Sequence, residues 1–204
     1  MKLNPVEKLL VNSPLRALWL RASVGWLYDA ACGPPVTRML EVGCGQGDAV
    51  RELVPRFHPR VLDAFDLDPA QLARARTRLA GAANGAQVRL WVGDAERIAA
   101  PDGHYDAVLE LAILHHVPDW RAALAEIRRV LRPGGMFLFE ELSREFFRDV
   151  PVLSGLLRRF TVHPWDTMFE FPAFRSALAD VGLRVTALRT HPLPGWHQGV
   201  AVRD

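Results

Sequence analysis

The chain has 204 residues, 50% of them hydrophobic, which is enough for one α/β domain with a full core and too little for a comfortable second domain. Its formal net charge is +2 and its 25 basic residues are scattered, which argues against a nucleic-acid-binding face. Two cysteines cannot build a disulfide framework, no N-terminal stretch has the order of a signal peptide, and no apolar run reaches the ~20 residues of a membrane span, so we expect a cytoplasmic protein.

Within residues 3–31 the sequence predicts an N-terminal helix that begins at Ser13, which is suited to the N-cap, with Pro14 at the first helical position. Apolar residues lie on both sides of this helix: Leu15, Leu18, Trp19, Ala22 and Trp26 on one side and Leu20, Val24 and Leu27 on the other. A helix that is apolar on both sides is usually buried against its domain, and we favour this over contact with a membrane surface. Trp26 and Tyr28 are candidates for lining a pocket beneath it, with a core role as the alternative.

The segment Met39 to Asp48, MLEVGCGQGD, is the most informative stretch of the sequence. A short apolar run leads into three alternating glycines, and apolar residues at helical spacing follow them. This pattern predicts a buried strand, a tight turn and a helix N-terminus, which is where open α/β sheets bind nucleotide-like ligands. Glycine allows the backbone to approach a ligand that a Cβ would exclude.

A dinucleotide is one ligand for such a turn, since Asp66 lies ~20 residues downstream, where a ribose-binding acid is expected. Glu41 and Asp48, however, place two carboxylates where a pyrophosphate needs bare N–H groups and positive potential. A ligand with an adenosine at one end and a cationic sulfonium and amino group at the other suits these charges. S-adenosylmethionine is such a ligand.

Further strands are expected at 61–66, 87–92, 105–111 and 136–142, with helices between them. The first of these helices is expected to end near Pro55. Asp68 and Asp119 have the position of N-caps, and Leu131 is expected on the inner face of the helix that Pro133-Gly134-Gly135 then stops.

The segment 143–171 combines apolar residues at helical spacing with flanking arginines, and we expect it to form a lid above the ligand edge of the sheet. A helix that ends at Gly182 and two alternating strands, 183–189 and 198–203, complete the chain. The expected organisation is a single domain, 1–204, with an N-terminal helical cap (1–34), a cofactor-binding core (36–142), the lid (143–171) and a C-terminal helix and hairpin (172–204).

Five ordered pieces of the chain resemble the class I S-adenosylmethionine-dependent methyltransferases, in particular their ubiquinone/menaquinone-biosynthesis type. These pieces are LEVGCGQG, FDLDP at 65–69, VGDAERI at 92–98, YDAVLELAILHHVPD at 105–119 and RRVLRPGGMFLFEE at 128–141. The resemblance implies an α/β, Rossmann-like, seven-stranded, mostly parallel sheet of order 3-2-1-4-5-7-6, with helices on both faces and a C-terminal antiparallel hairpin.

The resemblance also implies the cofactor S-adenosylmethionine, with S-adenosylhomocysteine as product, and a set of residues that bind it. Asp66 is expected on the ribose hydroxyls, Asp94 and Ala95 on the adenine, and Leu111 near the methionine amino group. The full set of expected cofactor-binding residues is Glu41, Gly43, Cys44, Gly45, Gly47, Asp66, Leu67, Asp94, Ala95, Leu111 and His116.

No catalytic residue is assigned from the sequence, because methyl transfer mainly requires alignment, and a base helps only where the acceptor must lose a proton. The candidates for such a base are His115, His116, Glu140, Glu141 and Tyr28. Adjacent histidines on an extended segment point to opposite faces, and no acid–histidine spacing completes a site, so we expect no metal.

The expected partner is a small, apolar or quinone- or lipid-like acceptor, with no nucleic acid, in a monomer or homodimer that can touch a membrane surface. The amino-methylating motif N/D-P-P-F/Y of nucleic-acid enzymes is missing after the fourth strand, where the chain reads Glu110-Leu111-Ala112-Ile113. Two alternatives stay open: a non-catalytic cofactor-binding protein that acts through a protein partner, and a nicotinamide oxidoreductase.

Overall fold

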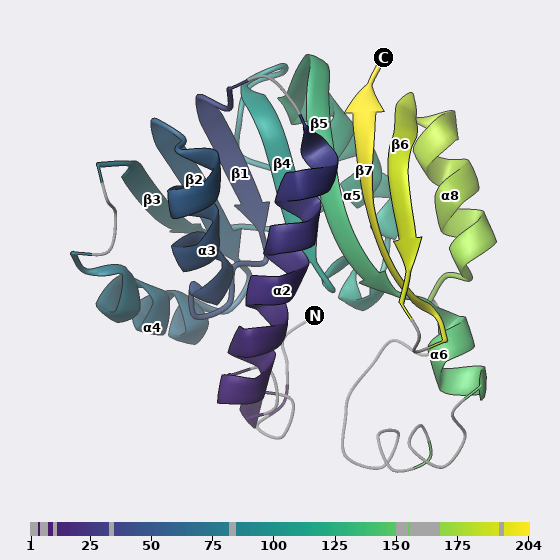
Figure 1. Ribbon diagram of the computed structural model, residues 1–204, viewed down its shortest axis with the longest axis horizontal. Coiled ribbons are helices and arrows are strands. Elements are labelled where there is room, and N and C mark those ends of the chain that lie inside the picture. Colours follow the sequence, from purple (N-terminus) through teal and green to yellow (C-terminus); the bar gives the residue numbers. More distant parts are fainter. Residues whose placement is uncertain are drawn as a thin grey trace.

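The fold is a seven-stranded sheet with helices on both faces (Figure 1). A computed structural model describes residues 4, 8–9, 12–32, 35–81, 85–149, 155, 168–191 and 194–204. The strands are β1 (Arg38–Val42), β2 (Val61–Asp66), β3 (Gln87–Val92), β4 (Tyr105–Leu111), β5 (Leu131–Leu142), β6 (Leu183–Thr190) and β7 (Trp196–Arg203). Their order is β3-β2-β1-β4-β5-β7-β6 with only β7 antiparallel to its neighbours, which confirms the predicted topology.

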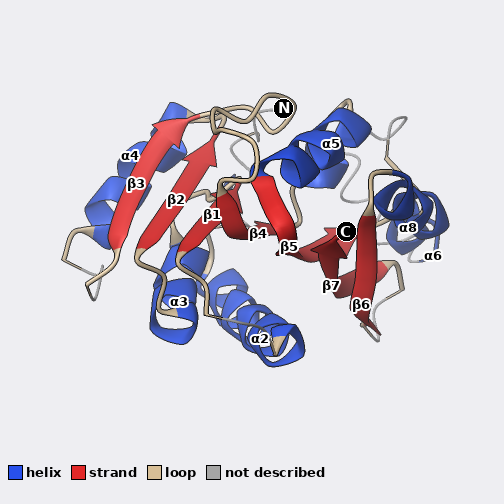
Figure 2. Cartoon of the chain, turned by 90° about the horizontal axis from the view of Figure 1, so that it is seen from above, coloured by secondary structure: helices blue, strands red, loops and turns tan. Residues whose placement is uncertain are grey.

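Successive strand residues point to opposite faces, and this alternation creates two cores. Leu40 and Val108 face the core that contains α5 (Trp120–Val130) and α8 (Phe171–Asp180). Met39 and Leu109 face the core that contains α2 (Pro14–Ala31), α3 (Asp48–Phe57) and α4 (Pro69–Leu79). Seen from above, α2 and α3 lie on one side of the sheet and α5 and α8 on the other (Figure 2).

Helix α2 begins as predicted, with Ser13 Oγ accepting a hydrogen bond from Arg16 N at 3.2 Å. The expectation that both of its sides are buried is wrong. Leu20, Val24 and Leu27 are buried against the sheet and α3, whereas Leu15 and Leu18 are 80% and 67% exposed. The side that carries Leu15 and Leu18 faces away from the sheet, so only one side of the helix is buried.

Helix α3 ends at Phe57, two residues after Pro55 and so close to the predicted end. One predicted helix end does differ from the structure. Helix α5 ends at Val130, and Leu131 already pairs with Tyr105 as the first residue of β5.

Of the expected lid, the structure describes Ser143, α6 (Arg144–Asp149), Gly155 and residues 168–171; the rest lies outside the described residues. Phe146 and Phe147 of α6 pack with Leu142 and Met168 in a small apolar cluster. No helix in the described part of the chain is both long and apolar enough to cross a membrane.

Candidate active site

A cavity of about 610 Å³ lies at the carboxyl ends of the parallel strands, which form the lower edge of the sheet in Figure 1. Its walls come from the segments that follow β1, β2, β3 and β4, from the first turn of α2 and from α6. This volume is typical of a small-molecule site. All eleven residues expected to bind the cofactor except Gly47 line this cavity.

The glycine turn shapes the cavity floor through backbone conformations that suit glycine. Gly43, Gly45 and Gly47 have φ of +72°, +53° and +84°, and the N–H groups of Gly43 and Cys44 both donate to Phe65 O at 2.9 Å. A Cβ on Gly45 would meet nothing nearer than Gln71 Nε2 at 4.0 Å, so this glycine borders open space. Gly47 instead packs against Leu79 of α4 and supports the turn from behind.

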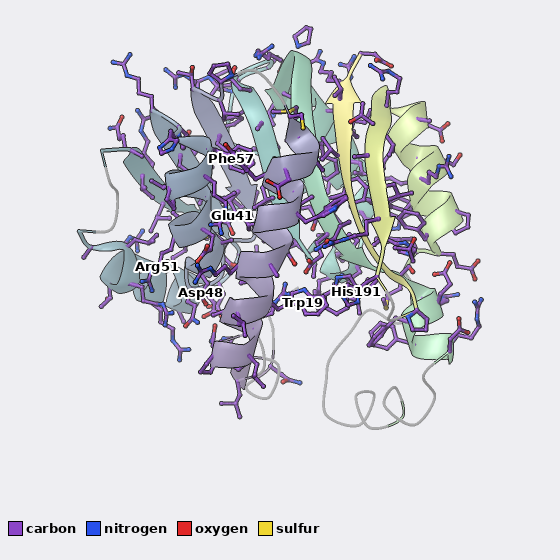
Figure 3. All side chains as sticks on the ribbon, in the orientation of Figure 1. Trp19, Glu41, Asp48, Arg51, Phe57 and His191 are labelled. Carbon is purple, nitrogen blue, oxygen red and sulfur yellow. The ribbon has the colours of Figure 1, made fainter. Side chains whose placement is uncertain are left out.

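Glu41 lies on β1 and Asp48 is the first residue of α3; both are labelled in Figure 3. Glu41 is 3% exposed, and its Oε2 has no hydrogen-bond partner among the described residues. Burial, with the nearby charges of Asp66 and Asp48, raises the pKa of Glu41 to about 8. Asp48 pairs with Arg78 Nη2 at 2.6 Å. The sequence argument took both groups as free negative charges; in the structure one is neutralised by burial and the other by an ion pair.

Glu41 nevertheless fits a cationic ligand. A buried carboxyl with an unpartnered oxygen gains most from a ligand that brings a positive charge to it, since that charge favours its ionised form.

Asp66 stands at the end of β2, where its two oxygens organise the loops on either side of it. Oδ2 accepts from Gly45 N at 2.9 Å and Oδ1 from Asp68 N at 2.8 Å. Burial is the largest influence on its pKa and raises it. Asp68 caps α4 through Ala70 N at 2.9 Å, as the sequence predicts, and also lines the cavity, where it pairs with Lys8.

Asp94 and Ala95 follow β3 at the cavity edge. Asp94 Oδ1 accepts from Glu96 N at 3.0 Å, so it also caps the short turn that follows β3. Leu67, Leu111 and His116 also lie in the cavity wall.

His115 and His116 occupy a 3₁₀ turn, η1 (Leu114–His116), and not the extended segment expected from the sequence. Their ring centroids are therefore 4.2 Å apart instead of on opposite faces. His115 Nδ1 lies 2.6 Å from Glu141 Oε2, and both side chains are buried. Among the described residues, no cluster of three or more histidine, cysteine or acidic residues could hold a metal ion.

Glu140 and Glu141, both named as candidates for a base, do not line the cavity. Glu140 is fully buried and accepts hydrogen bonds from Arg16 at 3.1 Å and Trp19 at 3.3 Å on α2, and from Ser23 and Gln198. It therefore fixes α2 to β5 and β7. In Figure 3, Trp19 lies beside His191, at a ring-centroid distance of 4.5 Å.

Tyr28 and Trp26, proposed for the pocket wall, are also absent from the cavity lining. Tyr28 is 44% exposed and packs edge-on against Phe57, labelled in Figure 3, at 5.1 Å. Arg189 lies over the Trp26 ring at 4.5 Å. Both residues lie in the last turns of α2, whereas the cavity lies at its first turn.

Sequence reasoning missed several cavity residues that come from distant segments: Arg16, Gln46, Gln71, Leu142 and Trp196. Phe146 and Phe147, which also line the cavity, belong to the segment expected to form the lid. Arg16 carried a signal, since it is one of three charged residues on a largely apolar helix. Ala112 was also missed; its φ of +62° is rare outside glycine and occurs where the chain leaves β4 toward η1.

The family model described as a methyltransferase domain matches residues 40–139. Over 170 residues the chain is 30% identical to a ubiquinone/menaquinone biosynthesis C-methyltransferase of Geobacter sulfurreducens, an alignment that covers 74% of this chain and 66% of that protein. The chain belongs to the class I S-adenosylmethionine-dependent methyltransferases. The cofactor of these methyltransferases is S-adenosylmethionine.

A second relative of this methyltransferase chain is a fatty-acid O-methyltransferase of Mycolicibacterium smegmatis, 36% identical over 116 residues that cover 56% of this chain and 39% of that protein. The chain thus spans about two thirds or less of the length of these two relatives. A solved S-adenosylmethionine-dependent methyltransferase from Aquifex aeolicus shares the fold, with a TM-score of 0.76, 18% identity and 100% coverage of both chains.

Proposed function

We propose that the chain transfers a methyl group from S-adenosylmethionine to a small, apolar acceptor of the quinone-like or lipid-like type. The observation that supports this most is the composition of the cavity at the carboxyl ends of the strands. Its polar part contains Glu41 and Asp66 beside the glycine turn, and its apolar part contains Leu142, Phe146 and Trp196. A cofactor with a polar body and an apolar acceptor would meet within it.

In this proposal the backbone of Gly43 to Gly45 and the carboxylate of Asp66 hold the ribose end of the cofactor, and Glu41 faces its cationic end. Leu67, Asp94 and Ala95 border the adenine, while Leu111 and His116 border the methionine part. When bound, the cofactor supplies an electrophilic methyl group on a sulfonium. The chain contributes orientation of the two reactants and exclusion of water, which convert the transfer into an effectively unimolecular step.

The relatives support the type of acceptor. One is named for ubiquinone/menaquinone biosynthesis and another for fatty acids, and both names imply a largely apolar molecule. A non-catalytic protein that binds the cofactor and acts through a protein partner is the alternative, and only turnover separates it from an enzyme.

The test is calorimetric titration of the purified chain with S-adenosylmethionine, S-adenosylhomocysteine and NADH. We expect micromolar binding of the two adenosyl ligands and none of NADH. Asp66→Asn is expected to weaken adenosyl binding by roughly 10- to 100-fold, because hydrogen bonds to a charged group contribute about 1.5–3 kcal/mol.

The matched control is Asp29→Asn, which changes an exposed aspartate on α2 outside the cavity lining and is expected to leave binding unchanged. Binding of NADH alone would contradict the proposed cofactor site. Binding without any release of S-adenosylhomocysteine in an acceptor screen would favour the non-catalytic alternative.

A further inference from the structure

His115 lies in the cavity wall on η1, with a buried carboxylate behind it. Glu141 is fully buried; its Oε2 is 2.6 Å from His115 Nδ1, and its Oε1 accepts from Ile113 N at 3.0 Å and Leu114 N at 2.5 Å. One carboxylate therefore fixes both the backbone of the turn and the imidazole it carries.

This contact determines which ring nitrogen of His115 can take a proton. A carboxylate accepts hydrogen bonds, so Nδ1 must carry the hydrogen that it donates to Glu141. In a neutral imidazole the other nitrogen, Nε2, then holds the lone pair and is the basic atom. The same carboxylate stabilises the imidazolium that forms when Nε2 is protonated.

Glu110 on β4 makes Glu141 suited to this role. Its Oε2 also accepts from Ile113 N, at 3.1 Å, so two buried carboxyl groups share one backbone donor. Burial and the charge of Glu141 raise the pKa of Glu110 well above its ordinary range. Glu110 is therefore biased toward its neutral form, whereas Glu141, whose Oε2 lies 2.6 Å from His115 Nδ1, is the carboxyl that faces the imidazole.

We infer that His115, oriented by Glu141, is the base that removes a proton from the methyl acceptor, and that the acceptor carries a weakly acidic hydroxyl, as in a phenol or hydroquinone. The inference rests on the proposed methyl transfer. The acceptor loses its hydroxyl proton to His115 Nε2, and an electron pair of the resulting anion forms the bond to the methyl group. The sulfonium keeps the electron pair of the broken carbon–sulfur bond and leaves as a thioether, and the proton passes to solvent.

The charges around the cavity favour this acceptor over a carboxylic acid. A carboxyl group ionises near pH ~4 and needs no base at neutral pH, whereas a phenol, with a pKa of about 10, does. An acceptor with a carboxylate would also require a cationic side chain in the cavity to bind it. The two basic residues among the described cavity-lining residues, Lys8 and Arg16, are paired with Asp68 and Glu140.

A first test needs no acceptor. In ¹⁵N-histidine NMR of the protein, the His115 signals are assigned by their loss in His115→Gln. We expect a protonated Nδ1 and a lone pair on Nε2. In Glu141→Gln the amide oxygen can still accept from the turn while its NH₂ donates to Nδ1, so the tautomer should invert. A wild-type signal with the hydrogen on Nε2 would overturn the inference.

A second test compares transfer of a radiolabelled methyl group to 1,4-naphthalenediol and to palmitate. We expect methylation of the diol, and a fall in kcat of at least about 100-fold in His115→Gln and Glu141→Gln, in line with general-base catalysis. Cofactor affinity should stay within about threefold. The control His104→Gln, at a histidine that contacts Arg38 outside the cavity lining, should leave the rate unchanged.

The pH dependence of kcat distinguishes a role of His115 as the base from a purely structural role. The titratable groups around the His115–Glu141 pair are Glu110, Glu140 and the neighbouring His116. The fall in kcat caused by His115→Gln should become smaller as the pH approaches the pKa of the diol, because the hydroxyl then ionises unaided. A fall in kcat that is independent of pH would overturn the inference. Methylation of palmitate alone would also overturn it while leaving the proposed transfer intact. Methylation of neither probe would count against the proposed acceptors, and the tautomer would then decide the role of His115.

Discussion

Glu41 is a buried carboxyl group whose effect on the pH dependence of stability can be measured. Its pKa of about 8 in the folded chain, set first by burial and then by Asp66 and Asp48, compares with ~4.3 in an unfolded chain. Between these values the unfolded chain loses the proton while the folded chain retains it. The contribution of the neutral carboxyl is thus fully present below pH ~4.3 and is lost as the pH rises toward 8.

We therefore expect Glu41→Gln without ligand to gain stability relative to the wild type as the pH rises from 5 to 8. The gain should reach a few kcal/mol at pH 8, since each unit of pKa shift corresponds to about 1.4 kcal/mol. Urea unfolding at several pH values measures it. Glu52→Gln, at a glutamate that pairs with Arg56 on α3, is the comparison and should show no such slope. Parallel pH profiles of Glu41→Gln and the wild type would contradict the assignment.

At the scale of elements, the two glycines Gly47 and Gly25 offer a matched pair of substitutions. Gly47, the N-cap of α3, has a φ of +84°, and a Cβ there would lie 2.9 Å from Leu79 Cδ1. Gly25 lies within α2, and a Cβ there would meet nothing within 4 Å.

We expect Gly47→Ala to destabilise the fold by at least about 1–2 kcal/mol, the cost of a left-handed conformation for a residue with a Cβ. Gly25→Ala should stabilise it by about 0.5–1 kcal/mol, because alanine loses less backbone entropy in a helix. Denaturant midpoints measure both. Equal midpoints would show that neither the turn nor the helix has the described backbone.

Helix α2 is held to the sheet in two different ways along its length. Its central turns bury Val24 and Leu27, whereas its first turns depend on polar contacts from Arg16 and Trp19 to the buried Glu140. Removing one partner from such a buried network is costly, because the remaining groups stay desolvated. The wall of the cavity that α2 forms thus depends on one carboxylate of β5.

At the scale of the whole molecule, the proposed cofactor should stabilise the fold by mass action. A ligand at 100 times its dissociation constant contributes about 2.7 kcal/mol if it binds only the folded state. For a chain of this size, 1 kcal/mol raises Tm by about 2–4 °C, so S-adenosylhomocysteine should raise Tm by roughly 5–10 °C. Differential scanning calorimetry measures the shift, with NADH at equal concentration as the control. A shift with NADH alone would contradict the proposed site.

The sequence alone determined the sheet and the position of the ligand edge. The glycine turn, the N-caps Ser13 and Asp68, and the strand-terminal Asp66 are local signals, because a few consecutive residues determine a strand, a turn or a cap. Parallel strands in a known order then bring their carboxyl ends together, so the predicted cofactor-binding residues converge on one cavity.

The tertiary structure alone decided how the candidate catalytic groups are paired. It joined His115 to Glu141, 26 residues apart, and Arg16 to Glu140, 124 residues apart, and it separated Tyr28 from the cavity. Local patterns carry no information on such pairs, since each depends on how helices and strands pack across the whole domain. The 3₁₀ turn at 114–116 also depends on a distant residue. Glu141 of β5 accepts hydrogen bonds from Ile113 N and Leu114 N, and these bonds hold His115 at the cavity wall.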